Sequence, residues 1–399
     1  MIRLFFKTIW NNRRRNILVF IELFMISLVL VNLTIYLVNM LAIYRIKNCY
    51  DTKNVIQVGI SKKLDEDEKI TEQSFQNLKK VFASNSFVEA VSICSNAIPY
   101  NYNVMSSEYR HDSDRINMDL RQTDIDYAKV MKITMLKGRW FDESDLGKAV
   151  KPIIISNDID EKYYKGDAVG KRLEEIEGGG HRNSYEIVGV VERFKRSDIE
   201  SPEPFAFFLQ EEVAKNFLGN TSLLIRTNEN KNSDMLAIAE SQVYSTLDPQ
   251  KWTIGTLNSL ENARAAMNVE SYQRNYLTVI IALFIMINVF LGTIGILWYN
   301  TNLRIHEIGI KRALGSTGKG IKGLLISENL FIAGLGLIIV VITMLQIPSF
   351  VGGGQTEPGV LKYSIWISIL IMAILVLLST WIPATIASKI RPAIALKTE

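Results

Sequence analysis

The residues of this 399-residue chain that could bind a metal or attack a substrate are few and widely spaced. Its three histidines are His111, His181 and His306, and none stands at the spacing of metal ligands. No nucleophile-elbow or zinc-protease motif occurs. We therefore predict no catalytic residue, no metal site and no cofactor in this chain.

A glycine-rich stretch at 313–320 comes closest to a nucleotide site. A phosphate loop needs glycine five residues before its second glycine and Ser or Thr after its lysine, but Ala313 and Gly320 stand there. A helical pattern, and not a strand, precedes the stretch. We predict a flexible turn with a basic tip here, and a hairpin turn at glycines 178–180.

Two carboxylates, Glu22 and Glu328, stand inside long apolar runs, where burying a charge in lipid is expensive. Each lies one or two helical turns inside the end of its run. We favour an interfacial carboxylate that pairs with a nearby Lys or Arg over a proton relay. Two cysteines, Cys49 and Cys94, lie outside the runs, and the sequence leaves open whether they form a disulfide.

Four apolar runs of about 24 residues or more must position all these groups. At a rise of 1.5 Å per residue, about 24 residues span about 36 Å, enough to cross about 30 Å of hydrocarbon. The first run is too long for a signal peptide, and no small-x-small cleavage site follows it. We predict membrane spans at 17–44, 276–299, 324–347 and 363–386.

The Lys and Arg residues give these spans an orientation. Residues 1–16, 300–323 and 387–399 together carry 13 basic and 2 acidic side chains, whereas residues 45–272 carry 30 basic and 36 acidic ones. Basic loops stay on the cytoplasmic side of a membrane. Both termini and the loop 300–323 are therefore expected in the cytoplasm, and the net charge of +4 indicates no affinity for nucleic acid.

The stretch of roughly 230 residues between the first two spans alternates strand-like and helix-like patterns, which predicts an α+β extracytoplasmic domain of two subdomains. Strands are expected at 55–60, 87–93, 116–121, 185–191, 205–209, 222–226 and 252–256, and helices at 72–83, 124–131, 158–165 and 234–247. An apolar run at 152–156 precedes the third of these helices. No Gly or Pro occurs between Thr256 and Leu291, so one helix starting near Ser259 can enter the membrane unbroken.

Residues 304–315 follow the pattern R-x-x-E-I-G-x-x-R-A-x-G. This resembles the cytoplasmic loop of the MacB/FtsX-like permeases of ABC transporters, with His306 in place of the commoner Arg or Lys. The match continues through Ser327-Glu328-Asn329 and through the closing Pro383-Ala384, Ala387, Arg391-Pro392 and Leu396. Residues 137–141, with Asp145, resemble the MacB-type periplasmic core domain.

The resemblance implies an integral membrane α-helical protein with four transmembrane helices and an α+β extracytoplasmic domain. Its expected parts are a cytoplasmic amphipathic helix 1–16, TM1 17–44, the core domain with a helical stalk 45–272, TM2 273–299, the coupling loop 300–323, TM3 324–347, a short outer loop 348–362, TM4 363–386 and a cytoplasmic tail 387–399. The expected location is a bacterial inner membrane.

The resemblance also implies a non-catalytic permease subunit that couples ATP hydrolysis to motion of the outer domain. The expected partners are two copies of a cytoplasmic ABC ATPase, which bind ATP and Mg, a second identical or related permease, the lipid bilayer, and a periplasmic adaptor or hydrolase. Residue 1 lies 16 residues before the first span, so the ATPase is expected to be a separate chain. Substrates would be peptides, lipoproteins or amphiphilic compounds. The alternative is an FtsX-like signalling module that regulates a cell-envelope hydrolase or sensor.

The loop's spacing agrees with contact to an ATPase, since Glu307, Lys311 and Arg312 share helical spacing. Ile308 and Leu314 are candidate anchors in an ATPase groove, Gly309 allows close approach, and Gly315 can end the helix. The alternative from spacing alone is an amphipathic helix on lipid headgroups. The expected coupling residues are Arg304, His306, Glu307, Ile308, Gly309, Lys311, Arg312, Ala313, Leu314 and Gly315.

Overall fold

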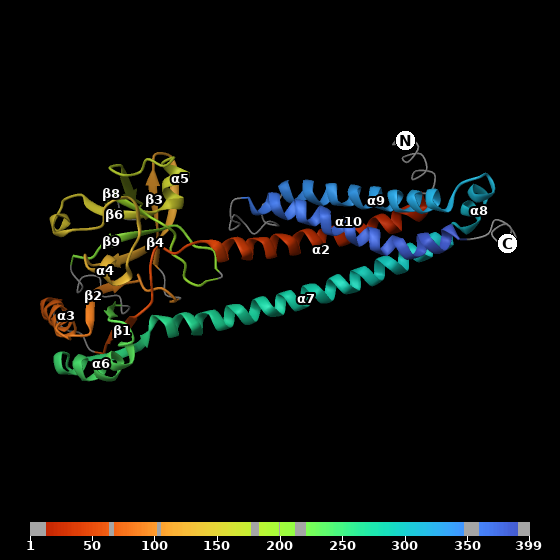
Figure 1. Cartoon of the computed structure of the whole chain (residues 1–399). Helices are drawn as coiled ribbons and strands as arrows, with labels where there is room; N and C mark the ends of the chain where they lie inside the picture. Colours follow the sequence, from red (N-terminus) through yellow and green to blue (C-terminus); the bar gives the residue numbers. More distant parts are fainter. Residues whose placement is uncertain are drawn as a thin grey trace. The chain divides into compact units, whose positions relative to one another are not determined.

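The computed structural model describes residues 13–63, 68–101, 105–176, 183–198, 200–211, 221–346 and 359–389 (Figure 1). The chain divides into two compact units. The membrane unit comprises Met1–Tyr44 and Gln273–Glu399, and the outer unit is Arg45–Tyr272. Residues 1–12 of the expected N-terminal helix, glycines 178–180, and most of the expected outer loop and cytoplasmic tail lie outside the described residues.

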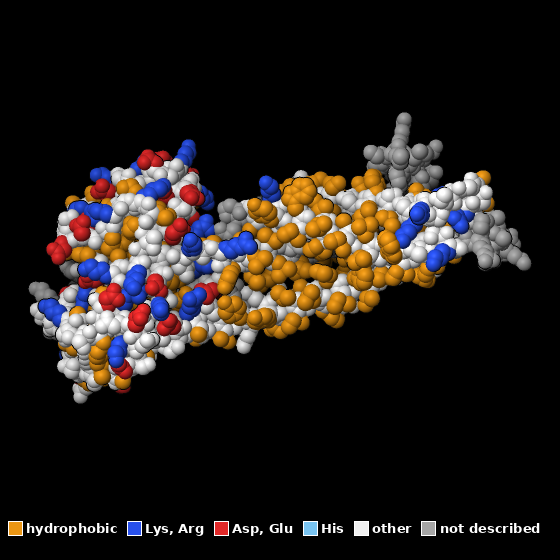
Figure 2. Space-filling model, viewed as in Figure 1, with side chains coloured by type: hydrophobic (Ala, Val, Ile, Leu, Met, Phe, Trp, Pro, Cys, Tyr) orange, Lys and Arg blue, Asp and Glu red, His pale blue; other side chains and the backbone are white. Residues whose placement is uncertain are grey.

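The membrane unit is built from long apolar helices. Within the described ranges, four helices have the length and composition to cross a membrane. Hydrophobic side chains cover the visible face of these helices, while charged side chains of both signs are scattered over the outer unit (Figure 2). The helices are α2 (Arg13–Arg45), α7 (Leu260–Asn302), α9 (Gly318–Gln346) and α10 (Val360–Ser388), with the shorter α8 (Ile305–Ala313) between α7 and α9.

Three of these helices pack closely. A Cβ at Gly336 of α9 would lie 3.2 Å from the Cα of Phe24, a tight contact, so glycine at this position favours the close approach of α9 to α2. The hydroxyls of Thr34 and Ser368 join α2 to α10. α7 packs least, since 11% of its most apolar stretch is buried against 44% for α9. Most of its apolar surface is left for lipid or another protein.

α7 also begins inside the outer unit. It runs from Leu260 to Asn302 as one helix of 43 residues, as the absence of Gly and Pro between Thr256 and Leu291 predicted. Leu260 is fully buried and belongs to the outer unit's core, together with Tyr50 and Phe194. The first turns of α7 therefore pack against the outer unit.

The outer unit has two lobes, which confirms the predicted mixed domain. In the sheet lobe, four antiparallel strands lie in the order β11-β1-β10-β2, and α3 and α6 pack on the same apolar core, around Phe75 and Trp252. These elements are β1 (Val55–Lys62), β2 (Val88–Ser95), β10 (Thr221–Thr227), β11 (Trp252–Ser259), α3 (Glu68–Ala83) and α6 (Asn232–Thr246).

In the barrel lobe, strand pairing closes on itself in the order β4-β3-β7-β8-β6-β9-β4. Parallel pairs β4–β9 and β6–β8 complete the ring, whose core includes Tyr109, Ile155 and Phe208. β4 also pairs with β2 through Cys94 and Ser95, which joins the lobes. The elements are β3 (Met105–His111), β4 (Asp114–Thr123), α4 (Tyr127–Met131), β5 (Met135–Gly138), η1 (Glu143–Asp145), β6 (Lys151–Ser156), α5 (Asn157–Tyr163), β7 (Arg172–Glu175), β8 (Ser184–Val191) and β9 (Phe205–Leu209).

The sequence predicted seven of these strands and all four helices of 45–259. It indicated β6 only as an apolar run, and it missed β3, β5 and β7. Cys49 and Cys94 are free thiols, both fully buried. Burial raises the pKa of Cys49 to about 12 and that of Cys94 well above its ordinary value. Both thiols are therefore protonated and unreactive at neutral pH.

Candidate functional site

The coupling loop forms the short helix α8, and Gly315 ends it as predicted. Gly315 has a φ of +95°, its N–H donates to the carbonyl of Arg312 over 3.1 Å, and the Ser316 N–H donates to the carbonyl of Lys311 over 3.0 Å. These two bonds are those of a Schellman cap, which needs a left-handed residue. The chain therefore turns sharply between α8 and α9.

One face of α8 packs on the helices of its own subunit. Ile308 is 4% exposed and lies in an apolar cluster with Leu325 of α9 and Ala384 of α10. Gly309 beside it is also buried. Here the structure differs from the expectation that Ile308 anchors α8 in an ATPase groove, because its side chain already fills a hydrophobic site within the bundle.

A buried ion pair holds the same face of α8. Arg304, the residue before α8, donates from a terminal guanidinium nitrogen to Oε2 of Glu328 in α9 over 2.7 Å, and the two side chains are 5% and 4% exposed. No described group bonds to the other carboxylate oxygen of Glu328. Glu328 is therefore a paired carboxylate, as favoured above, and it ties the start of α8 to α9.

Glu307 continues this network toward solvent. Its carboxylate accepts bonds from Nε of Arg304 over 3.3 Å and from Nζ of Lys311 over 3.1 Å. Burial alone would raise the pKa of Glu307, but Arg304 and Lys311 outweigh burial and lower the pKa below its ordinary value. Glu307 is thus a charged bridge along α8.

The opposite face of α8 is exposed and largely apolar. Leu303 is 53% exposed, Ile310 41% and Leu314 82%. His306 lies between them on the same face and is also exposed, as are Ala313 and Gly315. His306 and Ile310 of α8, together with the exposed Leu303 just before the helix and Leu314 just after it, form what we call the outer face of α8. Leu303 and Ile310 were missing from the predicted coupling residues, although their helical spacing with His306 and Leu314 could have indicated them.

Glu22 lies apart from this network. A Cβ added at Gly292 would be 3.4 Å from its carboxylate, so Glu22 points toward α7 at a position where α7 has no side chain. Among the described side chains, none forms an ion pair with Glu22. The pairing expected for Glu22 is therefore not seen within this part of the chain.

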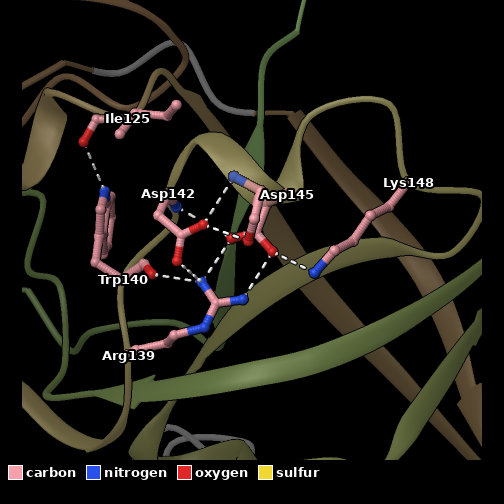
Figure 3. Close-up of polar contacts among 7 residues, drawn as sticks. Ile125, Arg139, Trp140, Asp142, Asp145 and Lys148 are labelled. Atoms are coloured by element: carbon pink, nitrogen blue, oxygen red, sulfur yellow. Dashed lines mark hydrogen bonds and ion pairs between the residues drawn. The ribbon is translucent and has the colours of Figure 1, made fainter.

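A second polar cluster, in the outer unit, contains Arg139 and Trp140 (Figure 3). Arg139 makes two parallel bonds to Asp145, of 2.6 and 2.7 Å, and Lys148 adds a third of 2.7 Å. The bonds from Arg139 hold the pKa of Asp145 well below its ordinary range. The indole N–H of Trp140 donates to the carbonyl of Ile125. Because the cluster's charges are paired with one another, it stabilises the loop 139–148 and offers no free group for catalysis.

Neither cluster contains the ligands of a metal site. Within the described ranges, no three His, Cys, Asp or Glu side chains gather as metal ligands would. The α8 site has an apolar outer face, and its inner face is held by an ion pair and a hydrophobic contact.

Two family models match this chain. Residues 25–240, more than half of the chain, match the model of the MacB-like periplasmic core domain, and residues 279–392 match that of the FtsX-like permease C-terminal domain. No curated protein matches the chain.

Several solved structures match about half of the chain. The extracellular domain of the noncanonic ABC-type transporter YknZ from Gram-positive bacteria is 16% identical, with a TM-score of 0.34, and the match covers 50% of this chain and 100% of that one. The periplasmic region of MacB from Actinobacillus actinomycetemcomitans is 12% identical, with a TM-score of 0.36 and coverage of 54% and 94%. A domain of a putative permease protein from Porphyromonas gingivalis is 14% identical, with a TM-score of 0.35 and coverage of 52% and 93%.

The two family models cover both the outer unit and the membrane unit, including α8. The chain belongs to the family of MacB/FtsX-like permease components of ABC transporters.

Proposed function

We propose that this chain is a permease subunit of the mechanotransmission type, which couples ATP hydrolysis by a separate cytoplasmic ATPase to movement of the outer unit. The observation that carries the proposal is the two-faced character of α8. Its inner face is bound to the bundle through Arg304 and Ile308, while Ile310 and Leu314 on its outer face are exposed. A force applied to the outer face would reach α9 directly through the buried ion pair.

The proposal places the outer face of α8 in the cytoplasm of a bacterium, with both termini, and the outer unit outside the inner membrane. The excess of basic residues in 1–16, 300–323 and 387–399 supports this orientation. The ATPase, in two copies, would bind ATP and Mg. This chain would hold no cofactor and perform no catalysis.

We further propose that a second permease, identical or related, binds in the membrane. The support is α7, whose most apolar stretch is only 11% buried within its own subunit. The substrate class would be peptides, lipoproteins or amphiphilic compounds acted on outside the membrane. Movement of the outer unit, and not passage of substrate between the helices, would do the work.

The test is a pair of charged substitutions on the outer face. In Ile310→Asp with Leu314→Asp, two carboxylates would have to lose water in an apolar groove, which typically costs several kcal/mol. We expect the tagged full-length chain to purify with an ATP-hydrolysing partner, and the double variant to retain less than a tenth of that activity.

Leu146→Asp is the matched control, because Leu146 is 47% exposed but lies in the outer unit. It should leave the co-purified ATPase unchanged. Full ATPase yield with the double variant, or a wild-type chain that carries no ATPase, would contradict the proposal and with it the cytoplasmic placement of α8.

A further inference from the structure

One loop of the outer unit contacts both connections to the membrane helices. It comprises residues 192–198, between β8 and β9 of the barrel lobe, and we call it the β8–β9 loop. On the connection that follows α2, the N–H of Cys49 donates to the carbonyl of Arg193 over 3.1 Å. The phenol of Tyr50 donates to the carbonyl of Lys195 over 2.6 Å. The incoming chain is thus bound to the loop at two successive residues.

The same loop holds the start of α7 through Asp198. One carboxylate oxygen of Asp198 accepts bonds from Nε of Arg264 over 2.9 Å and from the amide of Asn268 over 2.8 Å. The backbone N–H of Asp198 donates in return to the amide oxygen of Asn268 over 3.1 Å. Arg264 and Asn268 stand four residues apart, on one face of α7, so a single carboxylate fixes that face.

The contact between Asp198 and Asn268 lies in the interior of the outer unit, whereas Arg264 reaches Asp198 from a half-exposed position. Asp198 is 7% exposed and Asn268 5% exposed, and Met267 beside Asn268 is also buried. A buried carboxylate needs its hydrogen bonds, and losing them costs more than a typical surface contact. The need of this carboxylate for its hydrogen bonds therefore fixes the position of α7 against the loop.

The β8–β9 loop is also held firmly by the barrel lobe itself. Phe194 lies under the guanidinium of the fully buried Arg121 of β4, 3.8 Å from the ring centre. Arg196 donates to the carboxylate of Asp119, also on β4, over 3.0 Å. The ring of Tyr50 packs 4.6 Å from that of Phe194. When the barrel lobe moves, the loop must follow it.

We infer that the β8–β9 loop is the joint through which α7 and the connection from α2 move together with the barrel lobe, and that Asp198 is the positioning residue that fixes α7 to it. The inference rests on the proposed function. The loop contacts two segments that are more than 200 residues apart in sequence, near Tyr50 and Arg264. The pairing of β1 with β11 also joins these segments, within the sheet lobe, and the loop adds their connection to the barrel lobe.

The experiment uses the full chain with its ATPase in lipid nanodiscs and follows hydrogen–deuterium exchange at β6 and α5 of the barrel lobe. In the wild type we expect exchange there to differ between the nucleotide-free and the vanadate-trapped ATP states. Asp198→Ala should lose that difference, while ATPase binding and ATP hydrolysis remain. Asp234→Ala is the control, since it removes a half-exposed carboxylate of the same unit that pairs with Lys231.

A rescue separates transmission from stability. In Asp198→Cys with Asn268→Cys, the nucleotide-dependent difference should be absent when the thiols are reduced and return when they are oxidised to a disulfide. The native Cys49 and Cys94 are fully buried and should not interfere. If Asp198→Ala does not fold, judged by protection of β10, Asp198→Asn replaces it in the same assay. The same loss of the nucleotide-dependent difference is then expected.

The outcomes are distinct. A wild-type chain that binds no ATPase overturns the proposed function, and the joint falls with it. A wild-type chain that responds to nucleotide, beside an Asp198→Ala or reduced cysteine variant that responds equally, overturns the joint and leaves the proposed function standing.

Discussion

Two joints of this molecule use the same chemistry in different surroundings. In the membrane unit, Arg304 and Glu328 are 5% and 4% exposed. In the outer unit, Asp198 is 10% exposed at its side chain, but its partner Arg264 is 50% exposed. A buried pair that loses one member leaves an uncompensated charge, whereas water compensates a half-exposed one. We call the Arg304–Glu328 pair the inner joint, and the contact of Asp198 with Arg264 and Asn268 the outer joint. The inner joint should therefore hold or fail as a whole, and the outer joint should tolerate the loss of one contact.

The remaining bonds of each carboxylate deepen the contrast. Glu328 uses one oxygen on Arg304, and no described group satisfies the other. Asp198 is held by Arg264 and also by the neutral amide of Asn268, which bonds to it in both directions. The outer joint thus has a second partner. This suits a contact that must survive movement of the unit that carries it.

The largest expected effect is that of Arg304→Ala. Removing Arg304 leaves the carboxyl group of Glu328 buried without its partner, and breaking a buried pair costs about 3–5 kcal/mol. We expect α8 to detach from α9, with rapid hydrogen exchange over 304–313 and loss of ATP hydrolysis coupled to the chain. Exchange mass spectrometry on the full chain in nanodiscs measures this.

Replacing both partners provides the control for Arg304→Ala. Arg304→Met with Glu328→Leu removes both charges, so part of the stability should return although the pair is gone. If Arg304→Ala left α8 as protected as the wild type, the ion pair would not be what holds α8, and the contrast between the joints would fail.

A smaller effect is expected from Arg264→Ala. Because Arg264 is half exposed and Asn268 remains bonded to Asp198, we expect a loss of about 1 kcal/mol, at the upper end for exposed pairs. Salt should weaken the Arg264 effect, since the screening length is about 8 Å at physiological ionic strength, but should leave the Arg304 effect unchanged. Thermal unfolding of the two variants at low and high salt measures the difference. Equal salt dependence of the Arg264→Ala and Arg304→Ala effects would show that water reaches the two joints equally.

The sequence could predict the elements of these joints but not their pairing. The apolar runs, the helix from near Ser259 and the end of α8 at Gly315 follow from composition and local rules. Asp198 and Asn268 stand 70 residues apart, and nothing in their local sequences indicates that they meet. The closed barrel escaped prediction for a similar reason, because β7 (Arg-Leu-Glu-Glu) has too little apolar alternation to indicate a strand.

The face of α8 was ambiguous as well. Ile305, Ile308, Ile310 and Leu314 are spread around the helix, so apolar spacing alone does not show which of them is buried. The burial of Ile308 and the exposure of Leu314 are set by α9 and α10, which pack on one side only. The charge pattern was informative, since a carboxylate inside an apolar run needs a partner, and Glu328 finds it in Arg304.

The smallest effect should come from Lys311→Ala, which tests the exposed end of the inner joint. Lys311 and Glu307 are each 37% exposed and stand four residues apart, a pair worth about 0.3–0.5 kcal/mol.

The pKa of Glu307 is below its ordinary value of 4.5, so its charged form stabilises α8 above that pH, and this contribution is lost as the pH falls through the folded-state pKa. Lys311→Ala should raise that pKa toward 4.5 and leave Arg304 paired to Glu328, so α8 should remain protected at neutral pH and lose protection at a slightly higher pH than the wild type. Exchange of α8 between pH 3 and 7, corrected for the intrinsic rate, measures both. If Lys311→Ala exposed α8 at neutral pH as fully as Arg304→Ala, then α8 would be held from its solvent side, and the dry ion pair would not distinguish the inner joint from the outer one.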